Sequence, residues 1–181
     1  MDKRTYKIVT AAVVGAVYAA LTIALMPISF GMIQFRISEV LCILPFFMPC
    51  TAWGLFIGCA LANLISGNII DVIFGSLATL FAALAAAYIG KRRRRISGEL
   101  LACLMPVLFN GVIVGAVITA GYNGMSIFGN LGIFAMNCGF VALGEAGVLF
   151  AIGYPLMRQL PKKRLFSDLI SKLSVDDTKK C

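Results

Sequence analysis

The sequence predicts an all-α fold: a polytopic membrane protein that forms a bundle of six transmembrane helices, with both termini in the cytoplasm. Of its 181 residues, 60% are hydrophobic and only 13% are charged, about half the charged fraction of a soluble domain. The mean hydropathy is +0.94. Four long segments contain no Asp, Glu, Lys or Arg, namely 8–35, 40–70, 72–90 and 100–144. Uncharged segments of this length indicate a lipid environment.

The same composition excludes several functional classes. The chain contains no histidine, so histidine-based catalytic triads and histidine-ligated metal sites are not available. It has no P-loop motif, so any ATP must be bound by another chain. The chain has a formal charge of +8. In a membrane protein such a basic excess is typical of the cytoplasmic loops and does not indicate a nucleic-acid surface. The six cysteines include no C-x-x-C pair. We expect no enzyme activity, no nucleic-acid binding, no metal and no cofactor.

Four membrane spans are evident from apolar runs of about 20 residues, at 8–26, 69–90, 98–121 and 131–157. The segment 28–68 is long for one span and short for two, and Pro45 and Pro49 interrupt it. We interpret it as two helices with a turn near Pro49-Cys50-Thr51, because the distribution of cations requires an even number of spans.

Cations gather on the cytoplasmic side of membrane proteins. The N-terminal cations, the cations of residues 91–95 and the tail cations therefore belong on one side of the membrane. An even number of spans must then separate the N-terminus from the 91–95 run, and that run from the tail. Six spans satisfy this rule and leave only Arg36 outside the cytoplasm. The other cations are Lys3, Arg4, Lys7, the five of residues 91–95, Arg158, Lys162, Lys163, Arg164, Lys172, Lys179 and Lys180.

We divide the chain into a transmembrane substrate-binding domain, residues 1–157, and a basic cytoplasmic tail, residues 158–181. Apolar residues recur in the tail with helical spacing beside cations, which is typical of a short helix on a membrane surface. They are Leu165, Phe166, Leu169, Ile170 and Leu173. The alternative is a solvated tail without regular structure.

Several polar residues fall within or at the ends of the spans. An ionisable group there costs roughly 2.5–3.5 kcal/mol, so it usually faces a cavity or a partner. Such groups either line a binding site or only join helices through ion pairs and hydrogen bonds. Function is favoured for Glu145, because joining helices does not require a charge. The candidates are Arg36, Glu39, Asn63, Asp71, Asn110, Asn137 and Glu145.

Small residues at four-residue spacing occur in four spans, for example Gly54 and Gly58 or Gly111 and Gly115. Such residues let helix backbones approach closely. Because the pattern is so frequent here, packing within the bundle is its default interpretation.

Four motifs carry a family resemblance: Gln34-Phe35-Arg36-Ile37-Ser38-Glu39, the Ala-Asn-Leu-Ile-Ser of 62–66, Asp71-Val72-Ile73-Phe74-Gly75, and Gly144-Glu145. Over about residues 8–157 the chain resembles the queuosine-precursor transporter (QueT) family. Those proteins are substrate-binding S-components of energy-coupling factor (ECF) transporters in the bacterial plasma membrane. The longer, more basic 91–95 loop and tail depart modestly from the pattern.

The resemblance implies a six-helix bundle that binds a 7-deazaguanine, such as preQ0 or preQ1, from outside. It also implies partners, namely an ECF transmembrane subunit and two ATPase subunits. S-components of this kind contact the partner module through small residues of the first span, which assigns docking to Ala12, Ala16 and Ala20.

A deazaguanine suits the polar residues of the spans. Its Watson–Crick edge presents adjacent N–H donors beside a carbonyl, which a carboxylate and an amide can bind together. We expect Glu145 or Glu39 to accept the N–H groups. Asn110, Asn137 or Gln34 would assist, Phe35 or Trp53 would stack on the ring, and Arg36 and Asp71 would form the outer gate.

Other functions remain open. The chain could be a proton-coupled secondary carrier with Glu145 as its titrating group, an S-component for a different vitamin, or a membrane scaffold without a small-molecule ligand.

Overall fold

The computed structural model describes residues 2–29, 35–67, 69–122, 124 and 126–174. Gln34 lies outside these residues. All regular secondary structure within them is helical, which agrees with the predicted all-α class. The elements are α1 (Lys3–Ala24), α2 (Met26–Ser29), η1 (Ile37–Ile43), α3 (Leu44–Phe47), α4 (Thr51–Ser66), α5 (Ile69–Arg92), α6 (Ile96–Val117), η2 (Ile118–Tyr122), α7 (Leu131–Val148), η3 (Leu149–Gly153), α8 (Tyr154–Gln159), η4 (Leu160–Lys162) and α9 (Arg164–Ser174).

Four of these helical stretches are long and apolar enough to cross a membrane, namely Lys3–Ala24, Ile69–Arg92, Ile96–Gly121 and Leu131–Lys162. They match the four spans that the sequence makes evident. The intervening segment contains two shorter apolar helices, Ile37–Phe47 and Thr51–Ile65, with the expected turn at Pro49 and Cys50. The chain is therefore a multi-pass membrane protein. The count of six spans and the cytoplasmic termini remain predictions.

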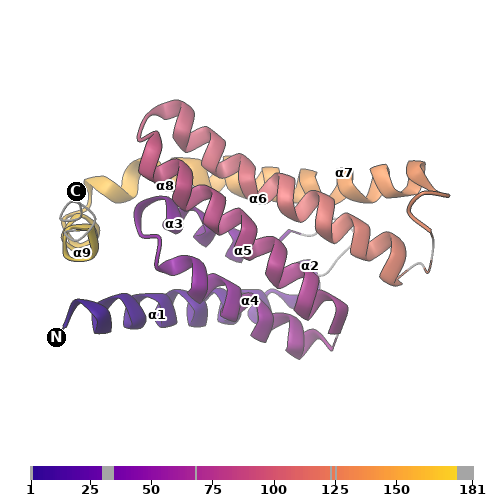
Figure 1. Ribbon diagram of the computed structural model, residues 1–181, viewed down its shortest axis with the longest axis horizontal. Coiled ribbons are helices and arrows are strands. Elements are labelled where there is room, and N and C mark those ends of the chain that lie inside the picture. Colours follow the sequence, from indigo (N-terminus) through magenta and orange to yellow (C-terminus); the bar gives the residue numbers. More distant parts are fainter. Residues whose placement is uncertain (1, 30–34, 68, 123, 125, 175–181) are drawn as a thin grey trace.

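The helices pack in a layered bundle around η1 and α3 (Figure 1). Helix α1 lies beside α4, α4 beside α5, α5 beside α6, and α6 beside α7. The η1 segment contacts α1, α4, α5, α6, α7 and η3, so it runs through the interior. Any polar group on η1 is thus surrounded by protein rather than by lipid.

Close approach of α1 and α4 depends on glycine. A Cβ added at Gly54 would overlap the backbone carbonyl of Ala11, and one at Gly58 would overlap Gly15. On the opposite side of the bundle, a Cβ at Gly115 would overlap Cys138 of α7. These contacts confirm the interpretation that the spaced glycines pack the bundle internally.

The η1 segment differs from the regular α-helix expected for the second span. Residues Ile37–Ile43 form a 3-10 helix, and the extended Arg36 precedes it. The backbone N–H of Glu39 donates to the carbonyl of Arg36 at 3.0 Å. Bonds from i to i+3 wind the chain more tightly than an α-helix, and such a segment within a span often marks a functional position. Pro45 follows at the start of α3, where its missing N–H is tolerated.

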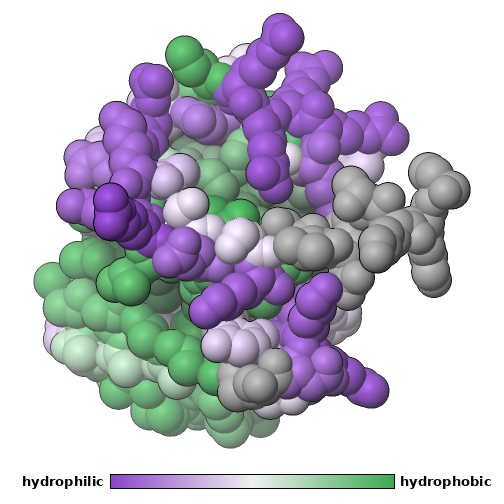
Figure 2. Space-filling view, turned by 90° about the vertical axis from the view of Figure 1, so that its left-hand side faces the viewer, coloured by the Kyte–Doolittle hydropathy of each residue, from purple (hydrophilic) through white to green (hydrophobic). Residues whose placement is uncertain are grey.

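Hydrophilic side chains gather at the end of the bundle where α1 begins and α9 lies (Figure 2), and the sequence of these segments is rich in Lys and Arg. The tail is joined to this end by contacts of its own. Arg158 Nε lies 3.8 Å from Glu99 Oε2 of α6, and Lys172 Nζ lies 5.6 Å from the ring centroid of Tyr6 in α1. This grouping is the one that the charge distribution predicts.

The tail helix exists but does not lie only on the membrane surface. Helix α9 packs on the bundle through Phe166, Leu169 and Ile170, and Leu173 is buried. The rings of Phe47 and Phe166 meet edge to face, with centroids 5.6 Å apart. Its apolar face thus covers α3, because burial against protein offers better packing than the bilayer surface.

Candidate functional site

A cluster of charged and polar side chains lies in the interior of the bundle. We call it the central polar cluster and define it as Tyr18, Arg36, Glu39, Asp71, Asn110 and Glu145. The four ionisable residues predicted from the sequence are all members, and each is at most 2% exposed. Charges this deep persist only with partners or with a ligand.

Glu39 is held by two donors. Its Oε1 accepts a hydrogen bond from the Tyr18 hydroxyl of α1, and its Oε2 accepts one from Cys42 Sγ at 2.9 Å. Because Cys42 lies one 3-10 turn after Glu39, η1 itself orients the carboxylate. Both oxygens of Glu39 are therefore engaged by the protein.

Arg36 supplies positive charge beside the carboxylates. Its Nε donates to the carbonyl of Ser29 at 3.4 Å, and its guanidinium is close enough to Glu39 and Asp71 for their charges to interact. With three carboxylates and one guanidinium, the central polar cluster has a formal excess of negative charge. This favours a ligand that brings hydrogen-bond donors or a positive charge.

Asp71 and Asn63 join α4 and α5. Asn63 Nδ2 donates to the backbone carbonyl of Asp71 at 2.9 Å and also lies 3.4 Å from Cys59 Sγ. Asn63 is close to Gly75 as well, where a Cβ would lie 3.1 Å from Nδ2. Asn63 therefore fixes the start of α5, which carries Asp71 into the interior.

Glu145 and Asn110 join α6 and α7. Asn110 Nδ2 donates to Glu145 Oε1 at 2.9 Å. Among the described residues, the other two oxygens of this pair, Glu145 Oε2 and Asn110 Oδ1, are buried and have no hydrogen-bond partner. Glu145 also interacts electrostatically with Glu39 and Arg36. The pair therefore holds two buried acceptors without donors, which N–H groups of a ligand could satisfy.

Asn137, which was expected to assist in ligand binding, has a different hydrogen-bond partner. Its Nδ2 donates to Thr119 Oγ1 at 3.0 Å, near the end of α6. Glu145 follows Asn137 by eight positions, which correspond to about 12 Å of helix. That separation explains why the amide pairs with a different neighbour.

The two aromatic candidates lie in different places. Phe35 packs against α7 at Gly147, where an added Cβ would lie 3.2 Å from Phe35 Cζ, and it is 41% exposed. Trp53 is 58% exposed and lines a surface groove between α1 and α4. The expectation that Trp53 stacks on a ligand is wrong for this site, because Trp53 belongs to the lipid-facing side of α4.

Tyr18 is a member that the sequence interpretation missed. The available signal was a pair of polar residues one turn apart, Tyr18 and Thr22, within an apolar span. Both are buried, and Thr22 Oγ1 lies 2.7 Å from Ser38 Oγ, its hydrogen-bond partner on η1. The small residues Ala12, Ala16 and Ala20 are exposed instead, so α1 has one face toward η1 and another toward the outside.

The described residues contain no group of three or more His, Cys, Asp or Glu side chains arranged to hold a metal ion. The acidic members of the central polar cluster contact Tyr, Cys, Asn and Arg instead. The central polar cluster thus brings together hydrogen-bonding side chains from α1, η1, α5, α6 and α7 in the interior of the bundle.

These features define the class of protein: a multi-pass helical membrane protein with a buried, acceptor-rich polar cluster. Comparison with known families agrees with this class. The family described as "QueT transporter" matches residues 8–162, which include every member of the central polar cluster. The chain belongs to the QueT transporter family.

A curated relative gives a further comparison. Over 79 residues the chain is 46% identical to a protein of Lactococcus lactis subsp. cremoris (strain MG1363) named "Queuosine precursor transporter QueT". The alignment covers 42% of this chain and 47% of the relative, so the chain matches about half the length of that protein. No solved structure matches the chain.

Proposed function

We propose that this chain is the membrane-embedded S-component of an ECF transporter in the bacterial plasma membrane, and that it binds a queuosine precursor of the 7-deazaguanine class. Membership of the QueT transporter family supports transport, and the name of the curated relative supports the substrate class. The central polar cluster is the proposed binding site.

The observation that carries the proposal is the acceptor pair formed by Glu145 Oε2 and Asn110 Oδ1. A deazaguanine ring presents an N–H and an exocyclic amine side by side, and both are donors. A carboxylate oxygen and an amide oxygen can accept them together. Leaving two buried acceptors without donors costs about 1–3 kcal/mol each, and the ligand would remove that cost.

The charge of the central polar cluster distinguishes between precursors. PreQ1 carries an aminomethyl group that is protonated at neutral pH, whereas preQ0 carries a neutral nitrile. The excess of carboxylates over Arg36 favours the cationic molecule. We therefore expect preQ1 to bind more tightly than preQ0.

Energy for uptake would come from partner chains. The sequence has no P-loop, which fits ATP hydrolysis by two ATPase subunits in a separate module. Ala12 and Ala16 line a groove of about 420 Å³ on the surface of α1 and α4, and Ala20 is exposed near them on α1. A groove floored by small residues suits a closely approaching helix of the ECF transmembrane subunit.

Binding by the purified chain alone tests the ligand. PreQ1, preQ0, queuine and guanine are added to the protein in detergent, and thermal unfolding is recorded. A ligand present at 100 times its Kd stabilises the folded state by about 2.7 kcal/mol. Stronger stabilisation by preQ1 than by guanine, which has the same Watson–Crick edge but lacks the cationic aminomethyl group, supports the proposal, and stabilisation by none of the four contradicts it.

The proton-coupled carrier is the second candidate, because Glu145 is a buried carboxylate with one oxygen lacking a donor. Uptake into proteoliposomes separates the two. The S-component needs ATP and the partner module, whereas the carrier needs only this chain and a pH gradient.

A further inference from the structure

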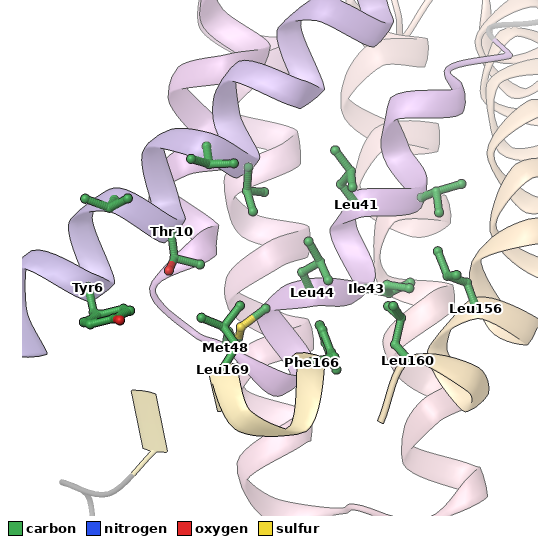
Figure 3. Close-up of a pocket in the computed structure, with 14 residues that line it drawn as sticks. Tyr6, Thr10, Leu41, Ile43, Leu44, Met48, Leu156, Leu160, Phe166 and Leu169 are labelled. Atoms are coloured by element: carbon green, nitrogen blue, oxygen red, sulfur yellow. The ribbon is translucent and has the colours of Figure 1, made fainter. Parts of the chain in front are cut away.

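A cavity separate from the central polar cluster lies at the cation-rich end of the bundle. It measures about 490 Å³, and side chains from α1, η1, α3 and α9, together with Leu156 and Leu160, point toward it (Figure 3). Tyr6 and Thr10 are its only polar lining residues among those described. Its wall is therefore suited to a hydrocarbon and not to a polar solute.

The cavity opens sideways along α1. Val9 and Val13 line it, yet they remain 45% and 56% exposed. Both lie in a helix that is long and apolar enough to cross the membrane. The molecules that surround this opening are membrane lipids, so a lipid acyl chain can enter without crossing water or displacing a helix.

Cations lie near the end of the cavity where α1 begins. Tyr6 lies there between Arg4 and Lys7 in the first turns of α1, and Lys172 Nζ sits 5.6 Å from the centroid of the Tyr6 ring. A cation and a phenol hydroxyl at the depth where α1 begins match the phosphate of a lipid headgroup. Cations near a membrane surface attract anionic lipids by about 1 kcal/mol each.

We propose that this cavity is a binding site for one anionic phospholipid. One acyl chain fills the space between Val13 of α1 and Leu169 of α9, and the phosphate lies beside Tyr6 and Lys172. The lipid completes the packing of α9, whose Phe166 and Leu169 form one wall. It also packs behind η1, which directs Val40, Leu41 and Ile43 to the cavity while Glu39 belongs to the central polar cluster.

Photo-crosslinking tests the proposal on the full-length chain. The protein is placed in nanodiscs of phosphatidylcholine that contain a small amount of phosphatidylglycerol with a diazirine on one acyl chain. Crosslinked peptides are then identified by mass spectrometry. We expect crosslinks in the peptides that contain Val13 and Leu169, at a level roughly fivefold above that of phosphatidylcholine with the same diazirine.

Two variants of α1 provide a matched comparison. Val13→Trp places a bulky ring in the opening and should reduce these crosslinks to background. Val17→Trp makes the same change one turn further along, at a residue that is 43% exposed but does not line the cavity, and should leave them unchanged. Leu169→Trp repeats the test from the opposite wall if Val13→Trp does not fold. Equal crosslinking in all three variants would overturn the site.

The headgroup is tested separately with Lys172→Gln. We expect this variant to retain crosslinks from the acyl chain but to lose the preference for phosphatidylglycerol. Arg94→Gln, which removes a cation from the turn between α5 and α6, should keep that preference. A preference that survives in Lys172→Gln, or that is already absent in the unaltered protein, would overturn the anionic headgroup assignment.

Discussion

Asn110 and Glu145 are joined by a 2.9 Å hydrogen bond across the interface of α6 and α7, and this bond fixes which atoms remain available. The amide donates its N–H to one carboxylate oxygen, so the amide carbonyl and the second carboxylate oxygen are left as acceptors without donors. The two helices approach closely beside this pair, since a Cβ at Gly111 would lie 3.3 Å from that of Ala142. The geometry of the acceptors is thus set by helix packing.

Replacing Asn110 by Leu is expected to weaken preQ1 binding by about 10- to 100-fold. The variant loses one acceptor for the ligand and the donor that orients Glu145, and each lost hydrogen bond to a charged group is worth about 1.5–3 kcal/mol. Isothermal titration calorimetry measures the change. Asn137→Leu is the control, because Asn137 pairs with Thr119. Equal weakening in both variants would show that the effect is not specific to the central polar cluster.

Tyr18→Phe is expected to destabilise the protein by about 1–3 kcal/mol. The substitution removes the hydroxyl that donates to Glu39 and leaves a buried carboxylate oxygen without that donor. Thermal unfolding in detergent measures the loss. Tyr88→Phe serves as a control because Tyr88 is 57% exposed, and its midpoint should stay within the error of the unaltered protein. If Tyr18→Phe also unfolds at the midpoint of the unaltered protein, the stabilising role assigned to the Tyr18 hydroxyl is contradicted.

Gly54→Leu is expected to prevent correct assembly of the bundle. Any side chain at this position would overlap the carbonyl of Ala11, so α1 and α4 must separate, and the face of α1 that carries Tyr18 moves away from η1. The yield of monodisperse protein in size-exclusion chromatography reports this failure. At Gly139 an added Cβ meets nothing within 4 Å, and Gly139→Leu should purify normally. A normal yield of Gly54→Leu would contradict the close helix contact.

Ala16→Trp is expected to separate binding from transport. The ring would fill the groove proposed for the ECF transmembrane subunit, while Ala16 lies on the face of α1 away from the central polar cluster. PreQ1 binding by the purified chain should be unchanged, and ATP-driven uptake by the assembled transporter should be lost. Leu143→Trp adds a ring at another exposed position and should retain uptake. Full uptake by Ala16→Trp would show that the ECF transmembrane subunit does not dock in this groove.

Sequence patterns predicted the long helices well because hydrophobic runs and cation clusters report directly on the solvent around them. The limits of α5, Ile69–Arg92, lie within two residues of the predicted span. The 3-10 form of η1 could not be predicted, because it depends on the interior contacts of the bundle. The spacing of apolar residues in the tail predicted a helix there. Its packing on α3 could not be predicted, because it depends on where the tail folds back onto the bundle.

At the candidate site, the charged residues could be predicted from the sequence more readily than the uncharged polar residues. A charge in an apolar run is costly anywhere in the span, so Arg36, Glu39, Asp71 and Glu145 could be selected from the sequence alone. Asparagine and tyrosine are tolerated singly, so their roles depend on which neighbour they meet. Asn110 meets Glu145 and Asn137 meets Thr119, and residue spacing within one helix does not distinguish these outcomes.

The most direct test compares preQ1 binding by the unaltered chain with binding by Glu145→Gln. The amide puts a donor among the oxygens that should receive the ligand's N–H groups, so we expect calorimetry to show a loss of affinity of about 100-fold or more. Glu99→Gln makes the same change at the cation-rich end, beside Arg158, and should bind like the unaltered protein. Affinity that is unchanged in Glu145→Gln would contradict the central claim.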